Sequence, residues 1–207
     1  KNEPEFKKAI AIRTILKTKS ELKIDDEKIS LMMGKNCHIV IYPLNKNKEL
    51  NLVCIVRDKK YDPDNIKSLV DRVITQNSNL KKAFEGELKS WPLYSTPQIL
   101  PSTNSKVFYI GDAFNGFLPT LAQGAGQSIE SAYELFKLIE EDKTHIQDAY
   151  FQERSKRAKI VRRRSNINFF SFHLSITIMQ VIRNFFMKFL VKRKRFISSY
   201  LGTVYKN

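Results

Sequence analysis

Cysteine and glycine are both scarce in this chain of 207 residues. The two cysteines, Cys37 and Cys54, exclude a disulfide framework and a cysteine-rich zinc site, and they favour a reducing compartment such as the cytoplasm. None of the seven glycines forms the Gly-x-Gly-x-x-Gly arrangement that binds a dinucleotide pyrophosphate. The longest uncharged stretch, residues 165–182, is 18 residues long and contains polar side chains, so it does not predict a transmembrane helix.

Acidic residues are almost absent from the C-terminal part of the sequence. Residues 151–207 hold fourteen Lys and Arg but a single acidic residue, Glu153, within a chain of net charge +15. The sequence therefore consists of a nearly neutral body and a basic C-terminal tail, and these two parts need separate explanations.

The first half of the chain has the period of two that is typical of strands. Residues 8–16, 38–44 and 50–57 alternate or are rich in β-branched side chains, and the polar residues 45–49 have the length of a hairpin turn. An antiparallel sheet is expected here. Arg13 lies in the middle of the first strand, either on a solvated face or as a cation that points into a pocket.

The second half predicts a strand, a loop, a glycine-rich turn and a helix. Residues 106–110 form a short apolar run that ends at Gly111 and Asp112. Gly124 and Gly126 come next, and apolar residues then recur at helical spacing. A carboxylate at the end of a strand can accept hydrogen bonds from a polyol, and free amides at a helix start favour negative charge. The alternative is a tight turn with a surface aspartate.

The whole segment 111–130, GDAFNGFLPTLAQGAGQSIE, resembles the second flavin-binding motif of the group A FAD-dependent aromatic-ring monooxygenases. Its nearest likeness is to the salicylate hydroxylases, with the ubiquinone-biosynthesis hydroxylases close by. The resemblance implies that Asp112 binds the ribityl chain of FAD and that Pro119 lies near the reactive edge of the flavin. Residues 123–127 would supply backbone amides to the ring. The implied cofactor-binding residues are Gly111, Asp112, Pro119, Gln123, Gly124, Ala125, Gly126 and Gln127, and no metal site is expected.

Two residues of the first half are the candidates for substrate contact. His38 is the candidate acid, base or phenolate contact because its ordinary pKa is about 6.5, and the alternative is a histidine hydrogen-bonded within the sheet. Arg13 matches a position where the salicylate-hydroxylase branch often has arginine. The chain departs from the family pattern at two places, with Phe114-Asn115 where Ala-His is usual and Ser95-Thr96 where Asp-Arg is common.

The fold expected from the resemblance is α+β, a fragment of a two-domain FAD/NAD(P)-binding monooxygenase. Residues 1–98 would form the antiparallel substrate-domain sheet with its helix, 99–148 the C-terminal strand, loop and helix of the FAD domain, and 149–207 a basic helical tail. Because the glycine-rich pyrophosphate motif is missing, the chain is interpreted as the C-terminal half of such an enzyme, inactive alone.

The implied reaction is hydroxylation of a small aromatic substrate with FAD, NAD(P)H and O2. Two alternatives stay open, a flavin-dependent oxidoreductase that does not hydroxylate and a non-catalytic basic binding module. The phenylalanine-rich basic tail favours peripheral contact with the inner face of a membrane over nucleic-acid binding, although a solvated helix with a core-facing stripe fits as well. A homodimer is a further expectation.

Overall fold

The computed structural model describes residues 3–17, 22, 27–75, 78–96, 107–141 and 145–205, without the side chains of 201 and 203–205. They divide into two compact units. The sheet unit comprises residues 6–93 and 170–184, and the helical unit comprises residues 1–5, 94–169 and 185–207. The chain passes from the sheet unit to the helical unit after residue 93, and residues 149–207 are divided between both units.

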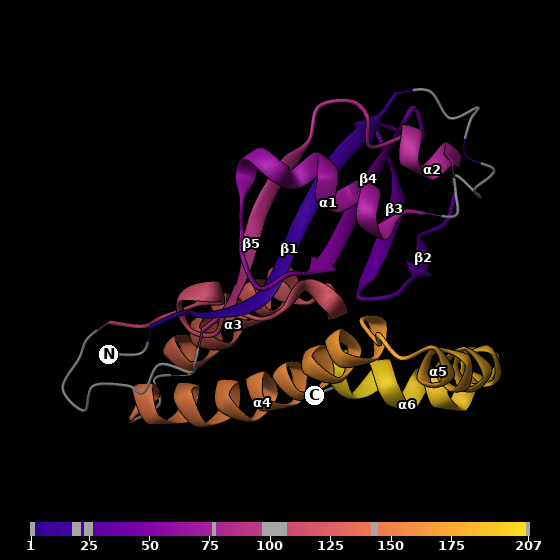
Figure 1. Cartoon of the computed structure of the whole chain (residues 1–207). Coiled ribbons are helices and arrows are strands. Elements are labelled where there is room, and N and C mark those ends of the chain that lie inside the picture. Colours follow the sequence, from indigo (N-terminus) through magenta and orange to yellow (C-terminus); the bar gives the residue numbers. More distant parts are fainter. Residues whose placement is uncertain are drawn as a thin grey trace. The chain divides into compact units, whose positions relative to one another are not determined.

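The sheet unit is built on five strands in the order β2-β3-β4-β1-β5 (Figure 1). They are β1 (Glu5–Leu16), β2 (Ser30–Met33), β3 (Cys37–Leu44), β4 (Glu49–Arg57) and β5 (Lys89–Ser95). β4 pairs antiparallel with both β1 and β3, which confirms the expected antiparallel sheet and hairpin. The turn between β3 and β4 has left-handed backbone at Asn45, Lys46 and Asn47.

One face of this sheet carries the hydrophobic core. The helices α1 (Ile66–Val73) and α2 (Ser78–Lys82) lie over that face (Figure 1). Alternate strand residues point into it because successive side chains of a strand face opposite ways. The core includes Ile10, Ile12, Ile39, Ile41, Leu50, Leu52, Val56, Leu69, Val70, Leu80 and Phe84. Burial in this core raises the pKa of the Cys37 and Cys54 thiols, which keeps them protonated and unreactive.

A short 3-10 helix, η1 (Pro63–Asn65), leads into α1. The carboxylate of Asp62 accepts a hydrogen bond from the backbone amide of Asp64 at 3.1 Å. Pro63 occupies the first helical position, where its missing N–H costs nothing. Asp62 and Pro63 thus supply the cap and the first residue of this helix start.

The helical unit contains most of the remaining elements. In chain order these are η2 (Gly111–Ala113), η3 (Pro119–Leu121), α3 (Gly124–Glu140), α4 (Ile146–Phe172), α5 (Thr177–Leu190) and α6 (Lys194–Tyr205). α4 and α5 each extend into the residue range of the sheet unit. Among the described residues, no helix combines the length and the hydropathy needed to cross a bilayer.

The strand expected at 106–110 is wrong for residues 107–110, while Lys106 lies outside the described residues. Ile110 has extended backbone, with φ −127° and ψ 161°, but the segment belongs to no strand ladder. A strand requires a hydrogen-bonded neighbour, and no described segment pairs with this one. Val107, Tyr109 and Ile110 are therefore left exposed.

Candidate cofactor cradle and substrate face

The turn at Gly111 fixes the position of Asp112 in the helical unit. Gly111 has φ +58°, which is a left-handed conformation that favours glycine. A Cβ at this residue would lie 2.7 Å from the Oγ of Ser128 on the first turns of α3. Only glycine satisfies both conditions, so η2 lies directly against the start of α3.

Asp112 is exposed at the start of η2. Within the described part of the chain its carboxylate makes no hydrogen bond and no ion pair. Both carboxylate oxygens are consequently available to accept hydrogen bonds from the hydroxyl groups of a ligand.

The start of α3 leaves three backbone amides free of intrahelical acceptors. The first helical hydrogen bond runs from the amide of Gln127 to the carbonyl of Gln123 at 2.8 Å, so the amides of residues 124–126 precede it. Ala122 has left-handed backbone, with φ 52° and ψ 34°, immediately before this helix start. A Cβ placed on Gly124 would meet no atom within 4 Å, which shows open space beside these amides. The arrangement suits a ligand that carries or develops negative charge.

Gln127 differs from the sequence expectation. Its amide is already donated to Gln123, and its side chain is only 3% exposed. The side-chain oxygen accepts from Arg154 at 2.9 Å and the side-chain nitrogen donates to Glu130 at 3.1 Å. Gln127 is therefore wrongly included among the amide donors, because the second turn of a helix has its acceptors within the helix. Gln123 is buried and supplies a carbonyl, while Pro119 is the exposed first residue of η3.

Arg154 of α4 donates hydrogen bonds to this helix start, and the sequence analysis did not single it out. Its guanidinium is buried and donates to the carbonyl of Gln127 at 3.2 Å and to the Oγ of Ser131 at 3.1 Å. It also forms an ion pair with Glu130 at 3.2 Å. Charge-assisted hydrogen bonds from a buried guanidinium are strong, so Arg154 fixes the first turns of α3.

Arg162 of α4 similarly fixes the loop that follows Asp112. It donates to the carbonyl of Thr96 at 2.5 Å and to the side-chain oxygen of Asn115. The amide of Gly116 in turn donates to the Oγ1 of Thr96 at 2.5 Å. Burial lowers the pKa of Arg162. The two places where the sequence departs from the family pattern, at Thr96 and Asn115, thus share one arginine as their partner.

The sheet unit carries a second polar cluster on the face opposite the core. The Nε of Arg13 on β1 donates to the Oδ1 of Asn51 on β4 at 2.5 Å. Asn51 is fully buried, and its Nδ2 has no hydrogen-bond partner among the described residues. A buried amide donor without a partner is costly, so this face presents unused hydrogen-bonding capacity beside a cation.

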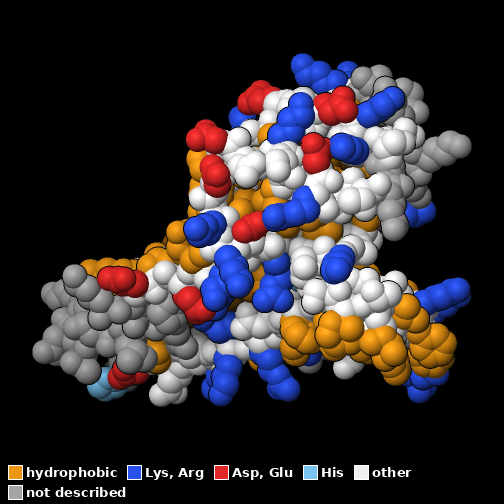
Figure 2. Space-filling model, viewed as in Figure 1, with side chains coloured by type: hydrophobic (Ala, Val, Ile, Leu, Met, Phe, Trp, Pro, Cys, Tyr) orange, Lys and Arg blue, Asp and Glu red, His pale blue; other side chains and the backbone are white. Residues whose placement is uncertain are grey.

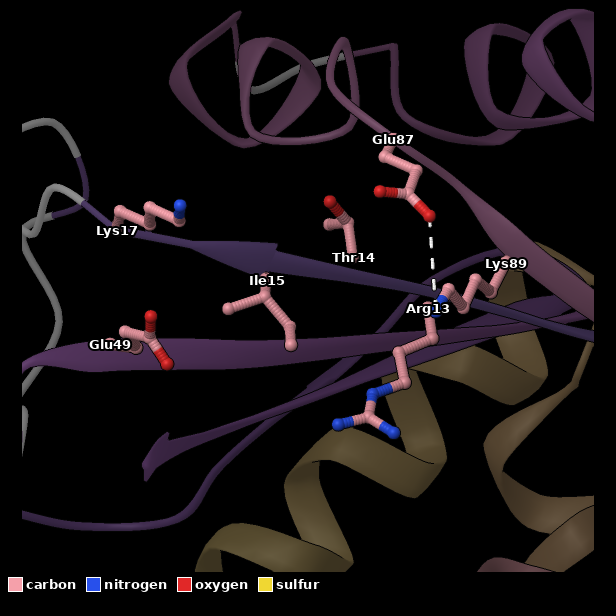
Figure 3. A pocket seen from close by; sticks show the side chains of 7 residues that line it. All are labelled: Arg13, Thr14, Ile15, Lys17, Glu49, Glu87 and Lys89. Atoms are coloured by element: carbon pink, nitrogen blue, oxygen red, sulfur yellow. Dashed lines mark ion pairs between the residues drawn. The ribbon is translucent and has the colours of Figure 1, made fainter. Parts of the chain in front are cut away.

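A cavity of about 470 Å³ opens beside Arg13 at the exposed end of β1 (Figure 3). Arg13 and Thr14 point to opposite sides of the strand, as Figure 3 shows. Glu87 and Lys89 form an ion pair of 3.8 Å on its rim. The lining residues are Arg13, Thr14, Ile15, Lys17, Glu49, Glu87 and Lys89.

His38 does not reach this cavity. It is 1% exposed, and its Nδ1 lies 3.1 Å from the Nε2 of His173. The ring of Phe172 approaches its edge with a centroid distance of 5.2 Å. Burial, with a smaller contribution from His173, lowers the pKa of His38 to about 3. The structure thus favours the alternative of a structural histidine over an acid–base role.

No group of three His, Cys or carboxylate side chains suited to a metal ion occurs within the described ranges.

Comparison with known proteins places this geometry in context. No model of a protein family matches the chain. The chain is 24% identical over 163 residues to 3-amino-4-hydroxybenzoate 2-monooxygenase PtmB3 of Streptomyces platensis, covering 71% of this chain and 40% of that relative. It is also 24% identical over 129 residues to salicylate hydroxylase of Pseudomonas putida, covering 55% of this chain and 29% of the relative. The chain is thus similar in sequence to these two aromatic-ring monooxygenases.

Solved structures show the same fold. Klebsiella pneumoniae HpxO complexed with FAD and uric acid matches with a TM-score of 0.74 at 14% identity, over 99% of this chain and 54% of that chain. A salicylate hydroxylase substrate complex matches with a TM-score of 0.70 at 16% identity, over 97% of this chain and 57% of that chain. The chain therefore has the fold of about half of an FAD-dependent monooxygenase, and it spans no more than 40% of the curated relatives named above.

Proposed function

We propose that the chain is part of an FAD-dependent monooxygenase that hydroxylates a small aromatic substrate with NAD(P)H and O2. The observation that carries the proposal is the junction of η2 and α3. There Asp112, which has no partner among the described residues, and the first three amides of α3 lie on turns that meet at Gly111 and Ser128. The FAD in the HpxO complex, whose fold matches this chain, supports the assignment.

The residues of this junction fit a flavin. Asp112 would accept hydrogen bonds from the ribityl hydroxyls, and the amides of residues 124–126 would donate to the polar end of the isoalloxazine ring. The partial positive charge of the α3 start would stabilise negative charge on that ring. Bound FAD would supply the redox and oxygen chemistry. Arg154 and Arg162 would keep the two turns in place without touching the ligand.

Arg13 supports a carboxylated or carbonyl-bearing aromatic substrate. It lines the cavity and brings a cation that its hydrogen bond to the buried Asn51 holds in place. A carboxylate accepts hydrogen bonds from a guanidinium. The two relatives named above are named for 3-amino-4-hydroxybenzoate and salicylate, which are aromatic carboxylates. His38 is left out of the substrate contact because His173 and Phe172 cover it.

Several finer expectations belong to the same proposal. A cytoplasmic location agrees with the two reduced cysteines, and peripheral membrane contact through the tail agrees with its basic composition. Homodimerisation is retained as an expectation.

The test starts with the visible absorption spectrum of the full-length protein after gel filtration. We expect flavin absorption in the wild type and its loss in Asp112→Ala. The matched control is Asp148→Ala, which removes an equally exposed carboxylate from the first turn of α4. A folded full-length protein that neither contains FAD nor takes it up would refute the flavin assignment.

A second measurement separates hydroxylation from other flavin chemistry. The flavin-loaded enzyme is supplied with NADH or NADPH, O2 and a panel of aromatic carboxylates, and the masses of the products are measured by mass spectrometry. We expect a product that is heavier by one oxygen atom and a raised KM for carboxylates in Arg13→Gln. Substrate oxidation without oxygen incorporation would instead favour the non-hydroxylating oxidoreductase.

A further inference from the structure

Helix α5 turns its apolar side away from the protein. The α5 apolar face consists of residues at helical spacing, each at least 50% exposed, namely Ile178, Val181, Ile182, Phe185, Phe186 and Phe189. The single buried residue of this helix is an arginine, Arg183. This is the reverse of an ordinary surface helix, whose apolar stripe faces the core.

Hydrogen bonds from two polar side chains of α5 determine which face of the helix is exposed. The guanidinium of Arg183 donates to the carbonyl of Ser171 at 3.0 Å and to the Oδ1 of Asn184 at 3.0 Å and 3.1 Å. The side chain of Gln180 donates to the carbonyl of Leu174 at 2.7 Å. Turning the apolar face inward would break the hydrogen bonds from Arg183 to Ser171 and from Gln180 to Leu174, so the apolar face stays outward.

The surroundings of this face are strongly basic. No acidic residue follows Glu153 in the sequence. Exposed cations cluster at the C-terminal end of α5 and just beyond it, namely Lys188, Lys192, Arg193, Lys194 and Arg195. Figure 2 shows a band of hydrophobic side chains over the region labelled α5 and α6 in Figure 1, with blue Lys and Arg atoms at its borders.

We propose that the α5 apolar face lies in the interface of an anionic membrane, with the cations at residues 188–195 on the lipid headgroups. A helix of 14 residues has the length to lie flat within one leaflet, and no described helix is suited to span the bilayer. Charge complementarity selects this occupant, because a cluster of exposed cations in a stretch of sequence without acidic residues is attracted to anionic lipid. The proposal is independent of flavin binding.

The experiment is co-sedimentation of the full-length protein with vesicles. We expect binding to phosphatidylcholine vesicles that contain phosphatidylglycerol, weak binding to pure phosphatidylcholine, and partial release by salt. Phe185→Ala/Phe189→Ala should weaken binding by at least about tenfold, because two large side chains no longer enter the apolar layer. The matched control is Phe136→Ala/Phe170→Ala, which truncates two exposed phenylalanines on α3 and α4 and should leave binding unchanged.

A double substitution that removes two cations tests the contact with the lipid headgroups. Lys192→Gln/Lys194→Gln should reduce binding about 30-fold, since each cation near an anionic surface contributes about 1 kcal/mol. Lys156→Gln/Lys159→Gln removes the same charge from exposed positions of α4 and should change binding little.

Three results would overturn the proposal. One is the absence of binding to anionic vesicles at low salt by the folded protein, as judged by circular dichroism. Another is equal binding by the α5 phenylalanine variant and the wild type, which would reduce the contact to bulk charge. The last is conversion of a dimer to a monomer by that variant with vesicle binding unchanged, which would make a second copy of the chain the occupant.

Discussion

Acidification is expected to destabilise the sheet unit through one buried pair, His38 and His173. The Nε2 of His173 lies 3.2 Å from the carbonyl oxygen of Ile55 and 3.1 Å from the Nδ1 of His38. A carbonyl can only accept, so His173 carries the proton on Nε2, and the Nδ1 of His38 is an acceptor. Adding a proton to His38 would set two N–H groups against each other in a buried site.

The size of the effect follows from the pKa of His38, which burial lowers from 6.5 to about 3. Between these two values the unfolded chain binds more protons than the folded one, so stability rises with pH and is complete above about 6.5. Lowering the pH from 7 to 5 should cost about 2 kcal/mol, because each pKa unit corresponds to about 1.4 kcal/mol.

Urea unfolding of the wild type and of His38→Gln, measured in steps from pH 8 to pH 5, checks this prediction. The wild type should lose about 2 kcal/mol more than the variant between pH 7 and pH 5. The matched control is His145→Gln, which removes an exposed histidine and should follow the wild-type profile. Parallel profiles for the wild type and His38→Gln would refute the reasoning, since the variant has no His38 proton to gain.

Two further substitutions probe the cofactor cradle. Gly111→Ala should destabilise the protein by about 1–3 kcal/mol through its left-handed backbone and close contact, whereas Gly86→Ala, in open space, should change little, as measured by thermal unfolding. Arg154→Met should cost about 3 kcal/mol, because Gln127 and its neighbours lose a buried charged donor. Arg163→Met removes an exposed arginine from the same helix, and an equal loss of stability there would argue against a special role for Arg154.

Local patterns were sufficient for much of the fold. Three strands, the hairpin turn and the helix start at Asp62 follow from alternation and capping chemistry, which act over a few residues. β2 has four residues, too few to establish a period, and β5 includes Pro92, which suggests a linker. Pro92 is tolerated because β5 is an edge strand. For residues 107–110 the sequence predicts a strand that the structure lacks, because an apolar run forms a strand only beside a hydrogen-bonded partner.

The candidate site likewise contains some residues that the sequence predicts and others that it does not. Gly111, Asp112 and the glycine-rich turn lie within 16 residues of one another, so their chemistry is visible in the sequence. Arg154 and Arg162 act on acceptors that lie 23 to 66 residues away, and nothing in a basic tail distinguishes them from solvated arginines. His38 shows the same limit of sequence reasoning. Its ordinary pKa suggests a catalytic role, whereas the structure favours the alternative of a structural histidine, because its buried partner His173 follows 135 positions later.

The basic tail therefore does not act as a single charged segment. Arg154, Arg162 and Arg183 are at least partly buried and donate to protein acceptors, so they contribute to the fold rather than to a polyanion contact. The exposed cations that remain near an exposed apolar face are those at residues 188–195. A basic binding module would contact a polyanion through cations along the whole tail and would not need an exposed apolar face beside them. The separation of buried anchors from an apolar, cationic end instead favours a helix held rigidly by its polar side with its apolar side presented to lipid.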